Sequence, residues 1–178
     1  NPNHTPGGSS SGSGSSVASG TVPMSVGTQT MASVNRPAIY CGISAFKPTN
    51  GTITTYGISP LAPSFDTPGF YGWSIADACY GYNSVSLNDK LPFKSLNKED
   101  VNIVSITDEL TSDIHPNVSK QIEETKLMLK ELGFNVEEKA SPVKFNDLLD
   151  LHWEILIYET GKNLQFLLNH PEELIGPR

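Results

Sequence analysis

The sequence has few of the residues that build disulfide frameworks, metal sites or nucleic-acid interfaces. It contains 2 cysteines and 4 histidines among 178 residues, and neither set has the spacing of a metal site. Lys and Arg number 12 against 19 Asp and Glu, and the excess acid lies in residues 101–178, which hold 7 basic and 14 acidic residues. Because phosphate binding needs clustered basic side chains, this balance argues against direct nucleic-acid binding. We expect no cofactor, and the lack of any apolar run near 18 residues predicts no membrane span.

Glycine and serine, by contrast, are concentrated near the start. Residues 7–16 consist only of Gly and Ser, a composition that by itself indicates a flexible linker. The chain then passes into small and apolar residues without a polar break, and alternation over 21–26 predicts a short buried strand. The small residues at 13–19 therefore favour a tightly packed helix over a linker.

The rest of the first half alternates between periodic segments and turn signals. We expect residues 34–46 to form a buried segment, with a helix that starts at Pro37. A β-branched strand over 52–58, a Pro/Gly loop over 59–72 and a helix over 74–82 should follow.

The second half has a clearer periodicity. Residues 101–106 predict a strand, and an amphipathic helix begins at Pro116 and ends before Gly133. A further strand over 134–138 and one or two helices within 144–169 follow. This order predicts an α/β fold, a mixed β-sheet covered by helices.

Four segments carry a resemblance in a fixed order. They are 1–13 (NPNHTPGGSSSGS), 27–42 (GTQTMASVNRPAIYCG), 46–51 (FKPTNG) and 64–69 (SFDTPG). Together they resemble the amidase signature family of serine hydrolases, and the resemblance is strongest over residues 1–82. It implies the amidase signature fold, with residues 1–82 as the core that holds two serines, 83–100 as a connection and 101–178 as a continuation of the same domain.

The resemblance also implies a Ser–Ser–Lys triad. Ser33 takes the place of the nucleophile, and Ser9 that of a bridging serine that follows a cis peptide bond and relays a proton to a lysine base. A serine hydroxyl needs such an acceptor, and desolvation lowers the pKa of a buried lysine enough to serve. The backbone N–H groups of Thr30, Met31 and Ala32, with that of Ser33, correspond to the oxyanion hole, where one donor is typically worth about 3–4 kcal/mol.

This sequence departs from the family at several points. The family has two glycines where Met31 and Ala32 stand here, which raises the prospect of altered specificity or lost activity. Lys47 lies in a landmark where the family's lysine is structural, so we reject it as the base and expect the catalytic lysine upstream of this chain. The chain is then a middle fragment of a longer enzyme, incomplete as a sheet and inactive alone.

The expected activity is hydrolysis of a carboxamide C–N bond in the cytoplasm. Its partner is a small-molecule amide substrate, and unpaired sheet edges favour self-association, for which a homodimer is the assembly to test. Three alternatives stay open: a catalytically impaired scaffold or partner subunit of the same fold, the A subunit of a tRNA-dependent amidotransferase, and an unrelated α/β domain that carries a Ser/Gly linker.

Overall fold

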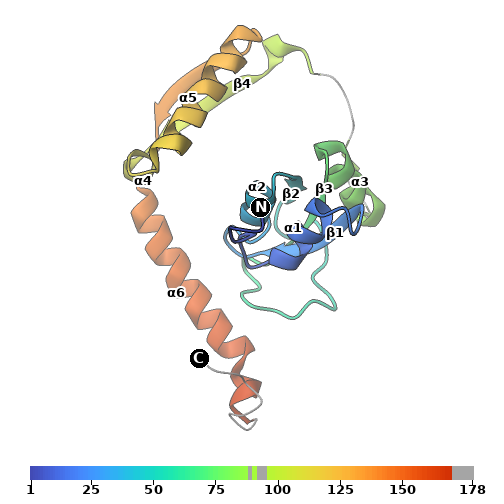
Figure 1. Ribbon diagram of the computed structural model, residues 1–178. Coiled ribbons are helices and arrows are strands. Elements are labelled where there is room, and N and C mark those ends of the chain that lie inside the picture. Colours follow the sequence, from blue (N-terminus) through green and yellow to red (C-terminus); the bar gives the residue numbers. More distant parts are fainter. Residues whose placement is uncertain (88–89, 92–95, 170–178) are drawn as a thin grey trace. The chain divides into compact units, whose positions relative to one another are not determined.

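The computed structural model describes residues 1–87, 90–91 and 96–169, which form two compact units. The first unit comprises Asn1–Phe93 and Ile155–Arg178, and the second comprises Lys94–Glu154. Each unit has its own sheet and helices (Figure 1). The mixed α/β composition agrees with the fold class expected from the sequence.

The first unit is built on a three-stranded antiparallel sheet. Its strands are β1 (Met24–Gln29), β2 (Ser44–Phe46) and β3 (Thr67–Gly72), in the order β1-β3-β2. The register pairs Met24 with Gly72 and Gln29 with Thr67, so β1 ends where β3 begins. All six residues of the central strand β3 are buried.

The structure contradicts two predictions for this unit and shortens a third, the helix over 34–46. The expected loop over 59–72 ends in strand β3, because burial between two partner strands overrides the turn chemistry of Thr67, Pro68 and Gly69. The expected strand over 52–58 forms turns instead, closed by backbone hydrogen bonds from Thr52 to Thr49 (3.2 Å) and from Ile58 to Thr55 (3.0 Å). No strand in the described part of the chain pairs with these β-branched residues, so their intrinsic preference for strand is not expressed.

Three helices cover this sheet: α1 (Ser11–Ala18), α2 (Asn35–Cys41) and α3 (Ile75–Val85). The Gly/Ser run is thus helical from Ser11 on, as its passage into apolar residues predicts. Gly14 of α1 is buried, and a Cβ there would lie 3.1 Å from Pro37 Cβ, so only a small residue lets α1 and α2 approach this closely. Helix α2 is shorter than the expected 34–46 because Gly42, at φ +70°, ends it before β2.

The core of the first unit joins the helices to the central strand. Val17, Val34, Ala38 and Tyr71 form one buried cluster. A second contact is aromatic, with the Tyr82 ring edge-on to Phe46 (5.3 Å between centroids) and to Phe70 (6.1 Å). Ser74 and Asp77 form a capping box that begins α3.

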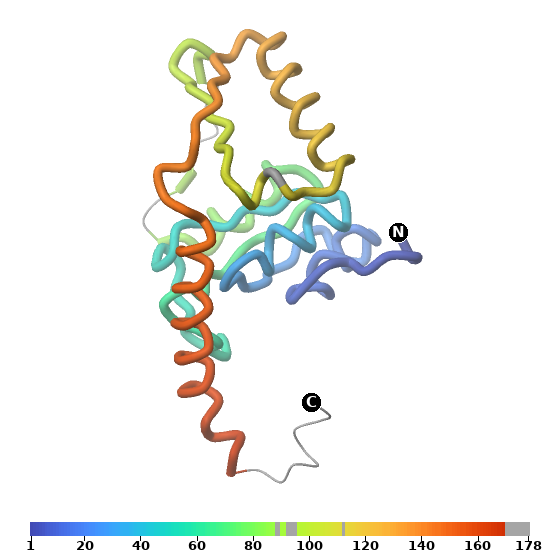
Figure 2. Tube along the Cα trace, turned by 90° about the vertical axis from the view of Figure 1, so that its left-hand side faces the viewer, coloured from blue at the N-terminus to red at the C-terminus, as the bar shows by residue number. Residues whose placement is uncertain are grey.

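The second unit is a parallel strand–helix–strand. Strands β4 (Asn102–Thr107) and β5 (Asn135–Ala140) pair in parallel, and α5 (Pro116–Glu131) connects them after the short helix α4 (Glu109–Ser112) (Figures 1 and 2). The predicted strands and helix are confirmed within one or two residues. His115 caps α5 by accepting the Asn117 N–H at Nδ1 (3.2 Å), and Gly133 adopts φ +87° after its end.

The remaining described elements are α6 (Phe145–Asn163) and the 3-10 turns η1 (Lys98–Asp100) and η2 (Gln165–Asn169). Within the first unit, Glu159 near the end of α6 accepts both the N–H and the hydroxyl of Ser64. The predicted connection over 83–100 and the end of the 101–178 region lie partly outside the described residues.

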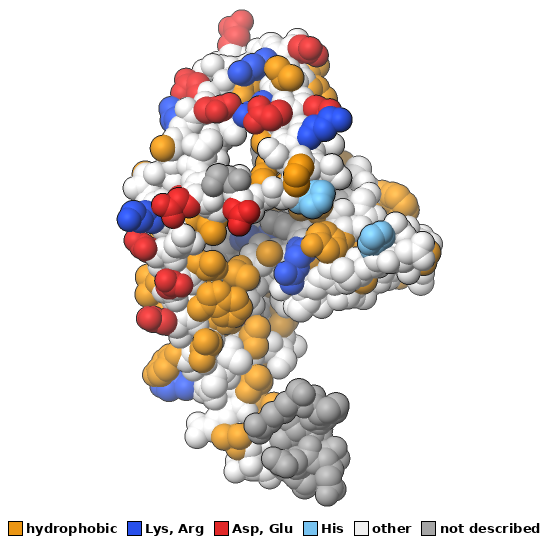
Figure 3. All heavy atoms as spheres, turned by 60° about the vertical axis from the view of Figure 1, so that its left-hand side comes forward, with side chains coloured by type: hydrophobic (Ala, Val, Ile, Leu, Met, Phe, Trp, Pro, Cys, Tyr) orange, Lys and Arg blue, Asp and Glu red, His pale blue; other side chains and the backbone are white. Residues whose placement is uncertain are grey.

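Acidic and basic side chains lie side by side on the surface (Figure 3). The exposed residues of α6 include Leu151, Ile157 and Tyr158. Within the described ranges, no helix has the length and apolar content needed to cross a bilayer.

Candidate active site

Ser33 lies in the loop between β1 and α2, half-buried and directly before the fully buried Val34. Its carbonyl oxygen accepts two hydrogen bonds, from the Ser10 N–H (3.3 Å) and the Tyr71 hydroxyl (3.2 Å). The bond from Ser10 brings the first serine motif, residues 1–13 with Ser9, beside Ser33. The backbone of Ser33 is therefore held from two sides and by the core residue that follows it.

Ser9 lies at the surface just before α1, and the peptide bond between Gly8 and Ser9 is cis. The segment around it is fixed to both helices, since the Gly8 carbonyl accepts from Arg36 Nε (2.9 Å) and the Gly7 carbonyl accepts from the Ser11 hydroxyl (2.7 Å). The structure thus brings the segments of Ser9 and Ser33 together. Within the described chain no hydrogen bond joins the two hydroxyls.

Close packing of the first serine motif on β1 needs a glycine. Ser10 Oγ donates to the Thr28 carbonyl (3.2 Å) and accepts from the Thr28 N–H (3.3 Å). A Cβ on Gly27 would lie 2.6 Å from Ser10 Oγ and 2.8 Å from Ser10 Cβ. Any side chain at position 27 would therefore push the first motif away from β1.

The loop before Ser33 is closed by Gln29, which is 6% exposed. Gln29 Oε1 accepts the N–H groups of Val34 and Asn35, each at 2.9 Å, so one side chain bridges the loop from its first residue to its last. The sequence motif alone gives Gln29 no separate role, and its bridging contacts are visible only in the structure.

Thr30, Met31 and Ala32 occupy the positions between these anchors. Among the described residues, their backbone N–H groups and that of Ser33 have no hydrogen-bond acceptor. The Met31 side chain is 44% exposed. Unpaired N–H groups held in a fixed loop beside a serine can stabilise a developing oxyanion.

Tyr71 supports Ser33 from the central strand. Burial raises the pKa of Tyr71 above the ordinary tyrosine value, against a smaller opposing effect of its contact with Ser10. The hydroxyl therefore stays protonated, as a donor must, throughout the physiological range. Sequence reasoning gives no sign of this role, because 38 residues separate Tyr71 from Ser33.

Lys47 is half-buried, and its Nζ donates to the carbonyl of the next residue, Pro48, at 2.5 Å. In the described part of the chain it has no hydrogen bond to Ser9 or Ser33. No group of three His, Cys, Asp or Glu residues with metal-binding geometry occurs among the described residues.

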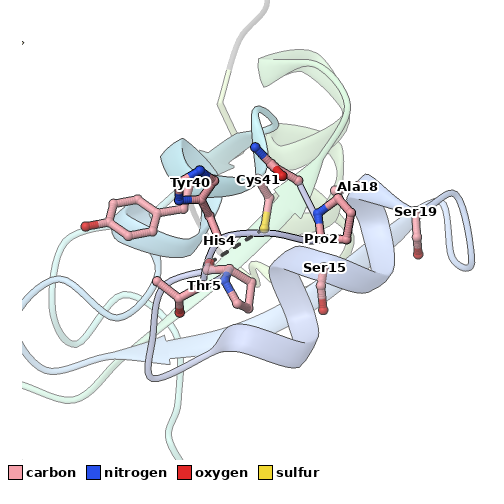
Figure 4. Close-up of a pocket in the computed structure, with 10 residues that line it drawn as sticks. Pro2, His4, Thr5, Ser15, Ala18, Ser19, Tyr40 and Cys41 are labelled. Atoms are coloured by element: carbon pink, nitrogen blue, oxygen red, sulfur yellow. Dashed lines mark hydrogen bonds between the residues drawn. The ribbon is translucent and has the colours of Figure 1, made fainter. Parts of the chain in front are cut away.

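A separate cavity of about 410 Å³ lies between the N-terminal segment, α1 and α2 (Figure 4). His4, Tyr40 and Cys41 line it, and the Cys41 thiol donates to the Pro6 carbonyl (3.6 Å). Neither Ser9 nor Ser33 is among its lining residues. This cavity is therefore distinct from the serine pair.

Comparison with known proteins identifies relatives over nearly the whole chain. Residues 1–175 match the protein family described as Amidase. The chain is 33% identical over 167 residues to the A subunit of the glutamyl-tRNA(Gln) amidotransferase of Helicobacter pylori, covering 88% of this chain and 35% of that protein. It is 35% identical over 150 residues to the indoleacetamide hydrolase of Pseudomonas syringae pv. syringae, covering 83% of this chain and 33% of that protein.

Solved structures of amidases and of an amidotransferase A subunit are similar to this chain as well. A crystal structure of an amidase superposes with a TM-score of 0.84 at 27% identity, over 97% of this chain and 39% of that one. The A subunit of the glutamyl-tRNA(Gln) amidotransferase of Thermotoga maritima superposes with a TM-score of 0.78 at 30% identity, over 89% of this chain and 37% of that one. The chain thus spans about 35% of the length of the Helicobacter pylori subunit.

Proposed function

The chain belongs to the amidase family, and from that membership we propose that it forms the nucleophile-bearing part of an amidohydrolase that cleaves a carboxamide C–N bond. The single observation that carries this proposal is the arrangement around Ser33. Its backbone is anchored by Ser10 and Tyr71, and the loop before it presents N–H groups that lack acceptors among the described residues.

In this proposal the Ser33 hydroxyl attacks the amide carbonyl. Its proton passes to Ser9 and from there to a lysine elsewhere in the complete protein, so Ser33 becomes nucleophilic as it loses the proton. The carbonyl oxygen becomes an oxyanion, which the N–H groups of the loop Thr30–Ser33 stabilise. The amide nitrogen takes up a proton and the C–N bond breaks, which releases an amine or ammonia and leaves an acyl ester on Ser33. Water then hydrolyses this ester.

The substrate is a small-molecule amide, and we place the reaction in the cytoplasm. The test uses the complete protein that contains this chain, a panel of primary amides and a measurement of released ammonia. Ser33→Ala should abolish release, while Ser59→Ala, which removes an exposed serine elsewhere, should leave it unchanged. Equal release by wild type and Ser33→Ala would contradict the proposal.

A second candidate is the A subunit of an amidotransferase, which the similarity to two such subunits supports. Hydrolysis would then depend on other subunits that copurify with the protein. A protein that is fully active as a single species would exclude this candidate.

The exposed Met31 supports a third candidate, a catalytically impaired member of the fold, because a methionine stands here where the family has a glycine. Such a protein would release no ammonia with or without partner subunits. Release that Ser33→Ala abolishes would exclude this reading.

A further inference from the structure

Asp66 is a buried carboxylate, 6% exposed, that lies directly before the central strand β3. Its Oδ2 accepts the N–H groups of Leu61 (2.8 Å) and Ala62 (2.9 Å), and its Oδ1 accepts the hydroxyl of Thr30 (2.8 Å). The two backbone bonds close the turn that contains Asp66, whereas the third reaches 36 residues back along the chain.

Burial of a carboxylate is costly unless donors surround it, and each of these bonds is strengthened by the charge. Asn50 adds a further restraint by donating from Nδ2 to the Asp66 carbonyl (3.2 Å) and to the Thr67 hydroxyl (3.2 Å). The hydrogen bonds from Leu61, Ala62 and Asn50 thus fix the position of Asp66 Oδ1 without any contribution from Thr30. Asp66 is a fixed point of the first unit.

The sheet register explains why Thr30 meets this fixed point. Strand β1 pairs Gln29 with Thr67, and the next antiparallel step places Thr30 opposite Asp66. Thr30 is also the first residue of the loop whose N–H groups lack acceptors in the described part of the chain, and that loop leads to Ser33. One hydrogen bond therefore joins the sheet to the start of the loop.

We propose that Asp66 is a positioning residue that holds the loop Thr30–Ser33 in its productive conformation through the Thr30 hydroxyl. Asp66 itself touches no reacting atom. It acts by keeping Thr30 from turning outward, so the donors that follow stay aimed at one point. The proposal rests on the proposed amidohydrolase function. It assigns to Asp66, which lies in the segment 64–69, a role that the sequence of that segment alone does not reveal.

The test compares three substitutions in the complete protein. Thr30→Val keeps the shape and removes the hydroxyl, Thr30→Ser keeps the hydroxyl, and Asp66→Asn weakens the acceptor. We expect Thr30→Val to lower kcat by about 10- to 100-fold with KM within about 3-fold, since small misplacements of catalytic groups cost about that much. Thr30→Ser should stay within about 3-fold of wild type in kcat.

The pair of residues acts as one unit, so Asp66→Asn combined with Thr30→Val should be no slower than the slower single variant. Thr52→Val is the matched control, because it removes another threonine hydroxyl, one that donates to the Thr49 carbonyl (2.7 Å) in an exposed turn. Wild-type kcat in Thr30→Val would overturn the positioning role while leaving the proposed function intact.

A second measurement separates the two ideas if no amide is hydrolysed. Hydrogen exchange of the Val34 and Asn35 amides, which donate to Gln29, reports the order of the loop without any turnover. We expect these amides to exchange about 10-fold faster in Thr30→Val than in wild type or Thr30→Ser. Unchanged exchange in Thr30→Val would overturn the proposal in an active or an inactive protein.

Discussion

Gly69 of the central strand offers a sharp test of how Ser33 is supported. A Cβ at position 69 would lie 2.7 Å from Val34 Cγ1 and 2.8 Å from Val34 Cγ2, and Val34 is fully buried. Alanine can adopt the backbone conformation of a strand, so the effect of Gly69→Ala is steric. Overpacking of this kind costs about 1–3 kcal/mol, and because Val34 follows Ser33, its displacement also moves the proposed nucleophile.

The assay is urea unfolding followed by circular dichroism, with ammonia release measured on the complete protein. Gly69→Ala should lower the unfolding midpoint and the activity together. Gly12→Ala is the matched control, since nothing lies within 4 Å of a Cβ at this exposed helical glycine. It should stabilise α1 by about 0.5–1 kcal/mol.

Combining Gly69→Ala with Val34→Ala removes the clashing methyl groups. The double variant should therefore be more stable than the sum of the two single effects predicts, by about 1 kcal/mol or more. If Gly69→Ala unfolds at the wild-type urea concentration, or if the two substitutions are additive, the packing of Val34 against β3 is not what supports Ser33.

Three further predictions concern the hydroxyls and the base. Tyr71→Phe should destabilise the protein by about 1 kcal/mol. Because the pKa of Tyr71 is raised in the folded state, its contribution to stability is complete below the pKa of tyrosine in the unfolded chain and disappears as the pH rises through the folded-state pKa. Ultraviolet titration should show one tyrosine that ionises at a higher pH than the others, and the same high-pH ionisation in Tyr71→Phe would refute the assignment. Ser9→Ala should lower turnover strongly with an unchanged circular dichroism spectrum, and Ser9→Ala with Ser33→Ala should be no slower than Ser33→Ala alone; near-normal turnover in Ser9→Ala would exclude the relay. The 178-residue chain by itself should hydrolyse no amide, and turnover that Lys47→Ala removes would identify Lys47 as a base after all.

Local signals in the second half of the sequence are sufficient to predict its two strands and the helix that connects them. Pro116 begins α5 and Gly133 follows its end, and both are strong helix-boundary signals that need no tertiary partner. In the first half the deciding interactions are distant. Thr67 to Gly69 have the composition of a turn, and only the pairing with β1 and β2 makes them a central strand.

The candidate site divides in the same way. The serine positions follow from short motifs whose residues are adjacent in sequence. The supporting contacts of Tyr71 and Asp66 do not, since they depend on the register of β1 against β3 across 38 and 36 residues respectively. The sequence places Asp66 in the segment 64–69 but does not predict its hydrogen bond with Thr30.

The most direct test of the central claim is the site of covalent modification by a fluorophosphonate. The complete protein is treated with the reagent, digested and analysed by mass spectrometry, with Ser33→Ala and Ser9→Ala alongside. We predict one adduct, on Ser33, that is absent in Ser33→Ala and formed more slowly in Ser9→Ala, because the relay activates the nucleophile. An adduct that persists in Ser33→Ala, or that maps to Ser9 in the wild type, would contradict the assignment of Ser33 as the nucleophile.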